Sequence, residues 1–461
     1  ESKMVAIITD RFKKQILNDL FTDVNDSSDT YYIAIGRSQD WNATDIAPIP
    51  TNTAKTERDF RNNMQAMKNA EDVSYVIPRY NWSSGTIYSG YDDHVEGYPT
   101  NSYYVMNDEL AVFICLQQGR DAEGSAVAST IKPSGSSLLP FTTADGYVWK
   151  YMYGQTAVRS TKFTSANYIP VQFVDSADAT SPALEQEQKT IQDAAVPGEV
   201  VAVKLNNGGT GYTSAPTVGF TGNGTKVPKA TATIYNGEIV KVEMDDSGSG
   251  KAFGAGYDYA SVTFSGGGGS GAHARAVISP KGIGGDARDD LRSNALMFNT
   301  KLEGDENNAL ITSNDFRQVG LIKNPVETDS ASAGLLFNSL AGNVLNKLKF
   351  GSIAQSFTED KTIQGSTSTA QAYVDKVDSN YVWYHQSDST GFLTFTEGET
   401  ITETDGNGIG ILDSAANDPD TDAFTKSTVK PFSGTLLYVD NRAAIERDPA
   451  QTEDIKVIIQ L

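Results

Sequence analysis

The sequence predicts a mainly β protein of the β-rich α+β class, and three observations lead to this prediction. Apolar residues follow a helical period only in the first part of the chain, and this period disappears near residue 80. Beyond that point, short runs of aromatic and β-branched residues alternate with loops rich in Gly, Ser and Asp, which is typical of stacked β-sheets. Two later stretches contain internal repeats whose residues alternate as they do in strands.

The N-terminal region is expected to form two helices. The first is predicted by apolar residues at helical spacing, namely Phe12, Ile16, Leu20, Phe21 and Val24. Thr9 or Asp10 is suited to cap this helix, because both side chains accept hydrogen bonds from free backbone N–H groups. Phe60, Met64 and Met67 have a similar spacing and suggest the second helix.

The strands expected outside the repeats are short and apolar. They cover Tyr31–Ile35, Val73–Ile77, Tyr103–Met106, Leu110–Leu116 and Gly146–Met152. Pro78 should end the second of them, because proline cannot donate to a strand ladder. Trp82, Tyr147, Trp149 and Tyr151 are expected to pack in the core, since aromatic side chains dominate the cores of β-rich domains.

The first internal repeat comprises two copies of one unit, which differ in length only in their loops. The matching positions are Gly198-Glu199-Val200-Val201 with Gly237-Glu238-Ile239-Val240, Gly209-Thr210-Gly211-Tyr212 with Gly254-Ala255-Gly256-Tyr257, and Val218, Phe220, Ala230 and Ala232 with Val262, Phe264, Ala274 and Ala276. The alternation Val-x-Phe and Ala-x-Ala predicts strands with one buried face. Because Tyr212 and Tyr257 are equivalent and follow glycines, we expect them to stabilise turns.

The second repeat is shorter, with its copies 38 residues apart. Phe357-Thr358-Glu359 and Thr362-Ile363 return as Phe395-Thr396-Glu397 and Thr400-Ile401. Between them, Tyr381-Val382-Trp383-Tyr384 is expected to form a strand. Two copies are too few for a solenoid, so both repeats are interpreted as small β modules built from duplicated hairpins.

The charge balance excludes several classes of partner. The chain has 37 Lys and Arg against 58 Asp and Glu, which gives a net charge of -21. This excess of negative charge would repel phosphates, so no nucleic-acid partner is expected. No apolar run approaches the ~20 residues that span a bilayer, so no membrane partner is expected. The single Cys115 excludes an intramolecular disulfide framework and is interpreted as a buried, inert residue.

Motifs that would carry chemistry are mostly absent, so we expect no enzyme, no cofactor and no metal. The glycine run 266–271 lacks the Lys and Ser or Thr of a phosphate loop. His94, His273 and His385 show no metal-ligand spacing. The alternating carboxylates in Asp418-Pro419-Asp420-Thr421-Asp422 leave a calcium site open as a hypothesis, although the Gly and Glu of a calcium loop are missing. A glycosidase carboxylate pair has no local signature and cannot be chosen from the sequence.

Several short stretches, taken in order, resemble one protein family. They are Gly36-Arg37-Ser38-Gln39-Asp40-Trp41, Ile77-Pro78-Arg79-Tyr80-Asn81-Trp82, Asp145-Gly146-Tyr147-Val148-Trp149-Lys150-Tyr151, Phe316-Arg317-Gln318-Val319 with Asn324-Pro325, and Tyr438-Val439-Asp440-Asn441-Arg442 with Gln451-Thr452-Glu453-Asp454-Ile455. Together they resemble the small, homodimer-forming baseplate wedge subunit of T-even-type contractile-tailed bacteriophages.

The resemblance implies a layered β-sandwich core with helices on long loops. Core residues 1–185, 285–345 and 432–461 would be interrupted by two inserted β modules at 190–283 and 350–426. The implied role is that of a structural virion protein in the tail baseplate, synthesised in the bacterial host cytoplasm. Its partners would be a second copy and the neighbouring wedge proteins. Fibre-attachment proteins could contact the inserted modules through exposed strand edges.

The candidate interface or structural residues come from the matching stretches. They are Arg37, Trp41, Arg79, Trp82, Trp149, Arg317, Asn324 and Arg442. Arginine is common at interfaces because it forms bidentate hydrogen bonds with carboxylates and stacks on aromatic rings. The same contacts can also hold loops in place within one chain. The alternative functions are a tail-associated protein that binds carbohydrate or contacts a receptor, with Tyr212, Tyr257, Trp383 and Tyr384 as glycan contacts, and a calcium-dependent adhesin.

Overall fold

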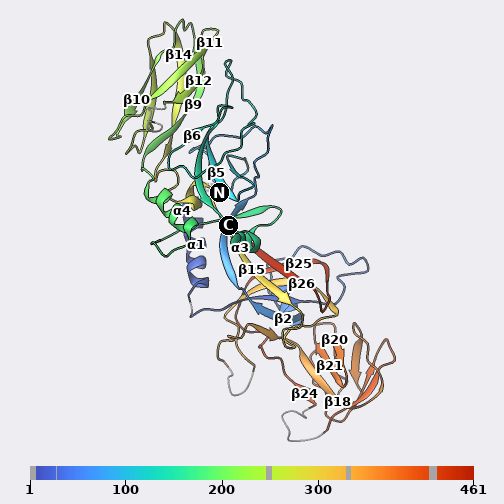
Figure 1. Cartoon of the computed structure of the whole chain (residues 1–461). Coiled ribbons are helices and arrows are strands. Elements are labelled where there is room, and N and C mark those ends of the chain that lie inside the picture. The colour runs from blue at the N-terminus through green and yellow to red at the C-terminus, as the bar shows by residue number, and fades with distance from the viewer. Residues whose placement is uncertain (1–6, 27, 246–251, 329–333, 415–422) are drawn as a thin grey trace, which may run out of the picture. The chain divides into compact units, whose positions relative to one another are not determined.

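A computed structural model describes residues 7–26, 28–245, 252–328, 334–414 and 423–461 (Figure 1). The chain is 42% strand and 11% helix, so the predicted mainly β class is confirmed. It forms two compact units: unit 1 holds residues 1–18, 74–297 and 460–461, and unit 2 holds residues 19–73 and 298–459. The residues of the expected single core are therefore divided between two units, and each unit contains one of the two repeat modules.

Unit 2 is built on a five-stranded antiparallel sheet of order β17-β2-β1-β16-β25. These strands are Ala341–Asn343, Met64–Asn69, Tyr31–Gly36, Asn314–Lys323 and Thr435–Arg447. All residues of β1 are buried, which explains its uninterrupted apolar sequence. At the end of the order, β25 is paired with β16 on one side.

The expected helix through Met64 and Met67 was wrong. Helix α2 (Ala54–Asn62) begins after Thr53, whose hydroxyl accepts from the backbone N–H of Thr56, and it ends before Met64. Met64 and Met67 lie instead in β2, which pairs with β1 on one side and β17 on the other. Pairing on both sides satisfies the backbone along this segment, so tertiary structure overrides the local apolar spacing.

Unit 1 contains a four-stranded sheet of order β4-β5-β7-β6. Its strands are Tyr104–Met106, Ala111–Gln117, Val148–Gly154 and Phe141–Thr142. Tyr147, Trp149 and Tyr151 are buried in one cluster with Cys115, and Trp82 packs against it. The predicted core role of these aromatic residues is therefore confirmed. Burial also raises the pKa of the Cys115 thiol, which keeps it unreactive.

A second four-stranded sheet has the order β26-β15-β3-β8, and the chain passes from one unit to the other within β15 and within β3. Its strands are Thr452–Gln460, Ala295–Glu303, Asp72–Pro78 and Tyr168–Val171. The remaining helices are α1 (Asp10–Val24), α3 (Ala157–Phe163), α4 (Ala183–Asp193) and α5 (Ala287–Asp290). Helix α1 lies where the sequence predicts it, but Leu17 is its buried residue while Phe12 and Ile16 are exposed.

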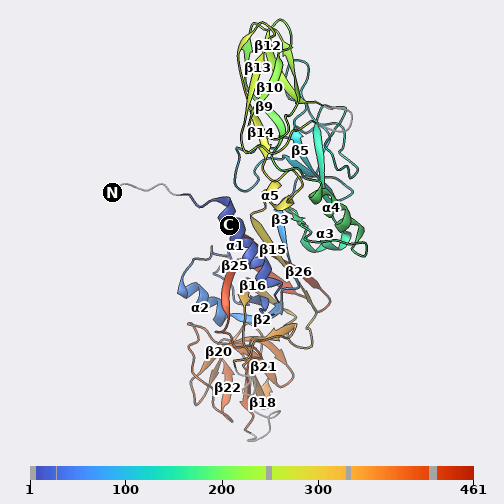
Figure 2. The same cartoon turned by 90° about the vertical axis from the view of Figure 1, so that its left-hand side faces the viewer.

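The first repeat module forms a near-closed six-stranded barrel of order β12-β11-β10-β13-β14-β9 (Figures 1 and 2). Its strands are Glu238–Met244, Ala230–Tyr235, Thr217–Gly222, Ala260–Ser265, Ser270–Ser279 and Glu199–Thr210. The copies interleave, because the first strand of each pairs with the last strand of the other. Tyr212 and Tyr257 are buried, and their rings cover Gly269 and Gly224, which confirms their structural role.

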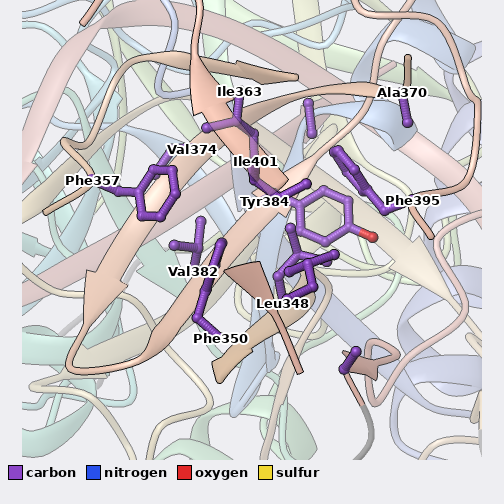
Figure 3. Close-up of a cluster of buried hydrophobic side chains, with 13 residues drawn as sticks. Leu348, Phe350, Phe357, Ile363, Ala370, Val374, Val382, Tyr384, Phe395 and Ile401 are labelled. Atoms are coloured by element: carbon purple, nitrogen blue, oxygen red, sulfur yellow. The ribbon is translucent and has the colours of Figure 1, made fainter. Parts of the chain in front are cut away.

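The second module is also a barrel, and its ring is closed. The order β21-β20-β19-β22-β23-β18 returns on itself through the β18–β21 pairing, with β24 beside β18. The strands are Tyr381–His385, Gln371–Asp378, Thr362–Gly365, Thr400–Glu403, Ile409–Leu412, Asn346–Gln355 and Phe424–Thr425. Phe357, Phe395, Ile363 and Ile401, which are equivalent in pairs, all lie in its buried core (Figure 3). Closure gives each strand of the ring two neighbours, while residues 350–355 of β18 pair with β23 alone and β24 pairs with β18 alone.

Candidate functional site

Arg317 on β16 is the centre of a charged cluster in unit 2. Its side chain is 5% exposed and forms ion pairs with Asp40 at 2.6 Å, Asp45 at 2.9 Å and Asp315 at 2.6 Å. It also donates to the carbonyl of Ser38. One guanidinium thus binds the loop that follows β1 at three points, which a planar fork of five N–H donors permits.

Three more candidate residues, Arg37, Trp41 and Arg442, meet in the same region. Arg37 has a positive φ of 63° and places its guanidinium 4.2 Å from the centre of the Trp41 ring. The Trp41 indole donates to the carbonyl of Arg442 on β25 at 2.8 Å. The Arg442 guanidinium itself lies 3.3 Å from Asp440 and is half exposed. The structure therefore brings four of the eight candidate residues together, with all of these contacts inside the chain.

The electrostatics of the cluster follow from its burial and its mixed charges. Burial opposes the charge of Arg317, but hydrogen bonds with Asp45 and Asp315 outweigh it and raise the pKa of Arg317. The same contact lowers the pKa of Asp45. Burial raises the pKa of Asp315 in spite of its pairing with Arg317, and it lowers the pKa of Arg37, which also lies near the positive charge of Arg317.

A buried polar network connects this cluster to the second module. Asp375 on β20 is fully buried and accepts from Ser38 at 2.8 Å and from His385 Nδ1 at 2.7 Å, while the Asn314 side chain donates to its carbonyl. Ser38 and His385 both bind the carboxylate rather than each other, so the imidazole is not placed to take the proton of the serine. These hydrogen bonds connect the second barrel to β16 through Asn314 and to the loop after β1 through Ser38.

The first module is fastened to unit 1 in a similar way. Asp92 accepts from Lys204 on β9 at 2.6 Å and from Arg275 on β14. Asp93 pairs with Arg275 at 2.8 Å and accepts from the backbone N–H of Ile278 at 2.9 Å. Hydrogen bonds from Lys204 and Arg275 outweigh the effect of burial and lower the pKa of Asp92. The first module therefore meets its unit at carboxylates paired with cations, whereas the second meets its unit at a buried carboxylate that accepts from polar side chains.

The other four candidate residues lie apart from the Arg317 cluster. Arg79 donates to Asn81 and to the carbonyl of Ser165, and Trp82 donates to Ser129. Trp149 is buried and stacks on Tyr147 with ring centres 5.6 Å apart. Asn324 has a φ of 54°, and its side-chain oxygen accepts from the backbone N–H of Thr30 at 2.8 Å. Their side chains fix turns and core packing within the chain.

Two buried charged residues, Asp375 and Arg447, are not among the candidates predicted from the sequence. Asp375 follows the alternating residues Ala372 and Val374, and a carboxylate inside an apolar strand is the signal that could have marked it. Arg447 is 2% exposed, pairs with Glu453 at 3.0 Å and donates to the carbonyls of Ile311 and Gly304. It lies at the end of β25, where the sequence shows only a charged turn.

The described part of the chain, residues 7–26, 28–245, 252–328, 334–414 and 423–461, also bears on metal binding and membrane insertion. Within it, no group of three or more His, Cys, Asp or Glu side chains is arranged to hold a metal ion. The calcium hypothesis for Asp418–Asp422 falls outside the described residues. Among the described helices, none has the length and apolar character needed to cross a bilayer.

No protein-family model matches the chain, and no curated protein matches its sequence.

Proposed function

We propose that the chain is a structural subunit of the tail baseplate wedge of a contractile-tailed phage, acting as a homodimer and through contacts with neighbouring wedge proteins. The proposal rests on one observation, the ordered set of stretches that resemble the small wedge subunit. In this proposal the two barrels are additions to a scaffold, and fibre-attachment proteins are among the partners that they contact.

The placement of the matching stretches supports this proposal. The stretches that contain Arg37, Arg317 and Arg442 meet at one cluster that fixes a long loop to two strands of the sheet. The multidentate contacts of Arg317 suit a rigid part of an assembly, because its guanidinium holds several groups in one geometry. The net charge of -21 keeps free subunits soluble before they assemble.

The proposal is tested by locating the protein in the particle. Gold-labelled antibody should mark the baseplate of intact virions whose sheaths are extended and of virions whose sheaths have contracted. Light scattering on the purified chain should give twice the 49.5 kDa of one copy. Absence of label from both intact and disrupted virions, with a known baseplate antigen detected in parallel, would refute the proposal.

A second candidate function is contact with a carbohydrate or receptor at the tail. Tyr381 and Trp383 lie half-buried on the second barrel, and the amine of Lys347 is 4.4 Å and 5.5 Å from their ring centres. Tyr212, Tyr257 and Tyr384 are buried and offer no such surface. Label on fibres or tips, together with glycan binding that Trp383→Ala abolishes, would favour this function.

A further inference from the structure

A cavity lined mainly by polar and charged residues lies beside helix α5 in unit 1. It has a volume of about 480 Å³, and its lining residues come mainly from α1 and from the segments 91–96, 279–281 and 286–293. Every residue of the lining belongs to unit 1. The charged groups in this lining decide which class of ligand the cavity can take.

Arg292, one of the lining residues, occupies a backbone position that usually belongs to glycine. At the end of α5, the N–H of Ser293 bonds to the Arg288 carbonyl at 2.8 Å, and the N–H of Arg292 bonds to the Asp289 carbonyl at 3.1 Å. These two bonds form a Schellman motif, whose left-handed residue is most often Gly. Arg292 adopts this conformation with a φ of 53°. An arginine kept at a strained position is expected to have a use for its side chain.

The guanidinium of Arg292 is buried, and only part of its hydrogen-bonding capacity is used. The residue is 9% exposed, and its guanidinium lies 4.7 Å from the ring centre of Tyr103 and 5.9 Å from that of Tyr91. It donates to the carbonyl of Asp92, and within the described part of the chain it forms no ion pair. A guanidinium carries five N–H donors, and a buried charge without a counter-ion is costly. Arg292 is therefore suited to receive an anion in the cavity.

The charged groups around Arg292 leave a surplus of positive charge. Arg288 donates to both carboxylate oxygens of Asp286, each at 3.0 Å. Lys14 and Lys281 share the single carboxylate of Asp289. Three cations therefore meet two carboxylates in these pairs, and Arg292 adds a further cation to the same lining.

The remaining acidic residues of the lining limit how much negative charge a ligand can carry. Asp93 already pairs with a cation of the first barrel, and burial raises the pKa of Asp290 to about 7, so part of its charge is absent at neutral pH. Asp10 and Glu96 lie in the same lining, together with the exposed Arg11. These carboxylates disfavour polyphosphates and other ligands with several charges, because like charges repel. A single carboxylate suits Arg292 best, since guanidinium and carboxylate form a planar bidentate pair.

We propose that this cavity binds a ligand through one carboxylate group, with Arg292 as the residue that holds it. A free organic acid and the C-terminus of a protein both carry this group, and the experiment below distinguishes the two sources. The inference is drawn from the cavity alone and goes beyond the proposed wedge function.

Calorimetric titration of the full chain at pH 7 tests the proposal. The probes are N-acetyl-dialanine, which ends in a free carboxylate, and propionate; the control is the carboxamide of the same peptide. At least one carboxylate should bind, and the carboxamide should bind about tenfold more weakly or worse, because it cannot form the charged pair. Tighter binding of the peptide would identify a protein C-terminus, and tighter binding of propionate a free acid. Equal binding of peptide and carboxamide, or no binding of either carboxylate at tens of millimolar, would overturn the proposal.

Matched variants assign the binding to Arg292. Arg292→Gly removes the guanidinium and suits the left-handed backbone, so unit 1 should still fold while carboxylate binding falls about tenfold or more. Arg37→Gly makes the same change at another arginine with a positive φ, in unit 2 and outside the cavity, and should leave binding unchanged.

Arg292→Lys keeps the test decisive if Arg292→Gly fails to fold. It retains the positive charge but loses the planar fork, so carboxylate binding should still weaken. Hydrogen exchange of the unchanged chain with bound probe should show added protection at residues 288–293. Binding in Arg292→Lys as tight as in the unchanged chain, or protection confined to other parts of the chain, would show that Arg292 does not hold the carboxylate.

Discussion

Gly219 and Thr263 face each other at the centre of the β10–β13 ladder, and they occupy the same position in the two copies of the first repeat. A Cβ on Gly219 would lie 2.7 Å from the Thr263 hydroxyl oxygen, so the smaller residue is required opposite the larger one. In the second module, Gln364 and Thr402 also occupy equivalent positions of the two copies and pair directly with each other. Both modules therefore pair equivalent strands about an internal pseudo-two-fold axis.

This symmetry predicts that Gly219 and Thr263 can be exchanged. Gly219→Thr alone should destabilise the barrel by about 1–3 kcal/mol through overpacking. Thr263→Gly alone should cost about 0.5–1 kcal/mol, because glycine weakens a strand interior. The double exchange should cost less stability than the sum of the two single substitutions, because it restores the same Gly–Thr pair with the two residues interchanged across the pseudo-two-fold axis. Hydrogen exchange in β10 and β13 measures these differences, and simple additivity would contradict the pairing symmetry.

A second prediction concerns pH and Asp290. Burial raises the pKa of Asp290 from 3.8 to about 7, although its carboxylate accepts from the backbone N–H of Gly284 at 2.7 Å. Because the folded pKa exceeds the unfolded one, unit 1 should lose stability as pH rises from about 4 to about 7 and level off above that. Asp290→Asn should flatten this dependence and raise the unfolding midpoint above pH 7.

The neighbouring Asp289 provides a control of opposite sign. Its pairing with Lys281 and Lys14 outweighs burial and lowers its pKa. Its contribution is therefore present at neutral pH and disappears as pH falls through the folded pKa, so Asp289→Asn should destabilise unit 1 at pH 7. Unfolding midpoints between pH 4 and 8 compare the two variants. The assignment for Asp290 fails if both substitutions shift the midpoint in the same direction at pH 7.

Much of the fold could be predicted from local signals. Alternation in Val218–Phe220 and Val262–Phe264 marked strands correctly, and the equivalent positions of Tyr212 and Tyr257 indicated buried turn residues. What local signals could not give was the partner of each strand. The interleaving of the two copies depends on pairings between residues far apart in the chain, such as Val200 with Ile278. The same limit explains β2, where pairing on both sides decided between helix and strand.

The candidate site was predictable only in part for a related reason. Arg37, Trp41, Arg317 and Arg442 lie in separate stretches of the sequence, and nothing in these stretches indicates that the four residues share one cluster. Nor does it show that Asp375 and Ser38 meet, since they are separated by more than 300 residues. Such contacts depend on how distant segments fold together, which neither spacing nor composition encodes.

Arg317→Lys should release the loop that follows β1. A lysine amine is a single point charge and cannot hold Asp40, Asp45 and Asp315 together as the guanidinium does. Because lysine keeps the charge but gives up several charge-assisted hydrogen bonds, we expect unit 2 to lose about 1.5–3 kcal/mol of stability. Faster hydrogen exchange in residues 38–48 and a red-shifted Trp41 emission would report the change. Arg442→Ala is the control, because Trp41 binds the Arg442 backbone; exchange as fast in this variant would contradict the role of Arg317.

Arg447→Met should be more damaging than any surface charge substitution in unit 2. It leaves Glu453 buried without its cation and removes the donors to the Ile311 and Gly304 carbonyls at 2.7 Å and 2.9 Å. Breaking one side of a buried pair costs about 3–5 kcal/mol. Lys456→Met, which removes a more exposed pair with Asp454, should cost less than about 1 kcal/mol. Urea unfolding of unit 2 measures the loss of unfolding free energy in each variant. Equal losses would show that the Arg447–Glu453 pair contributes no more to stability than an exposed pair.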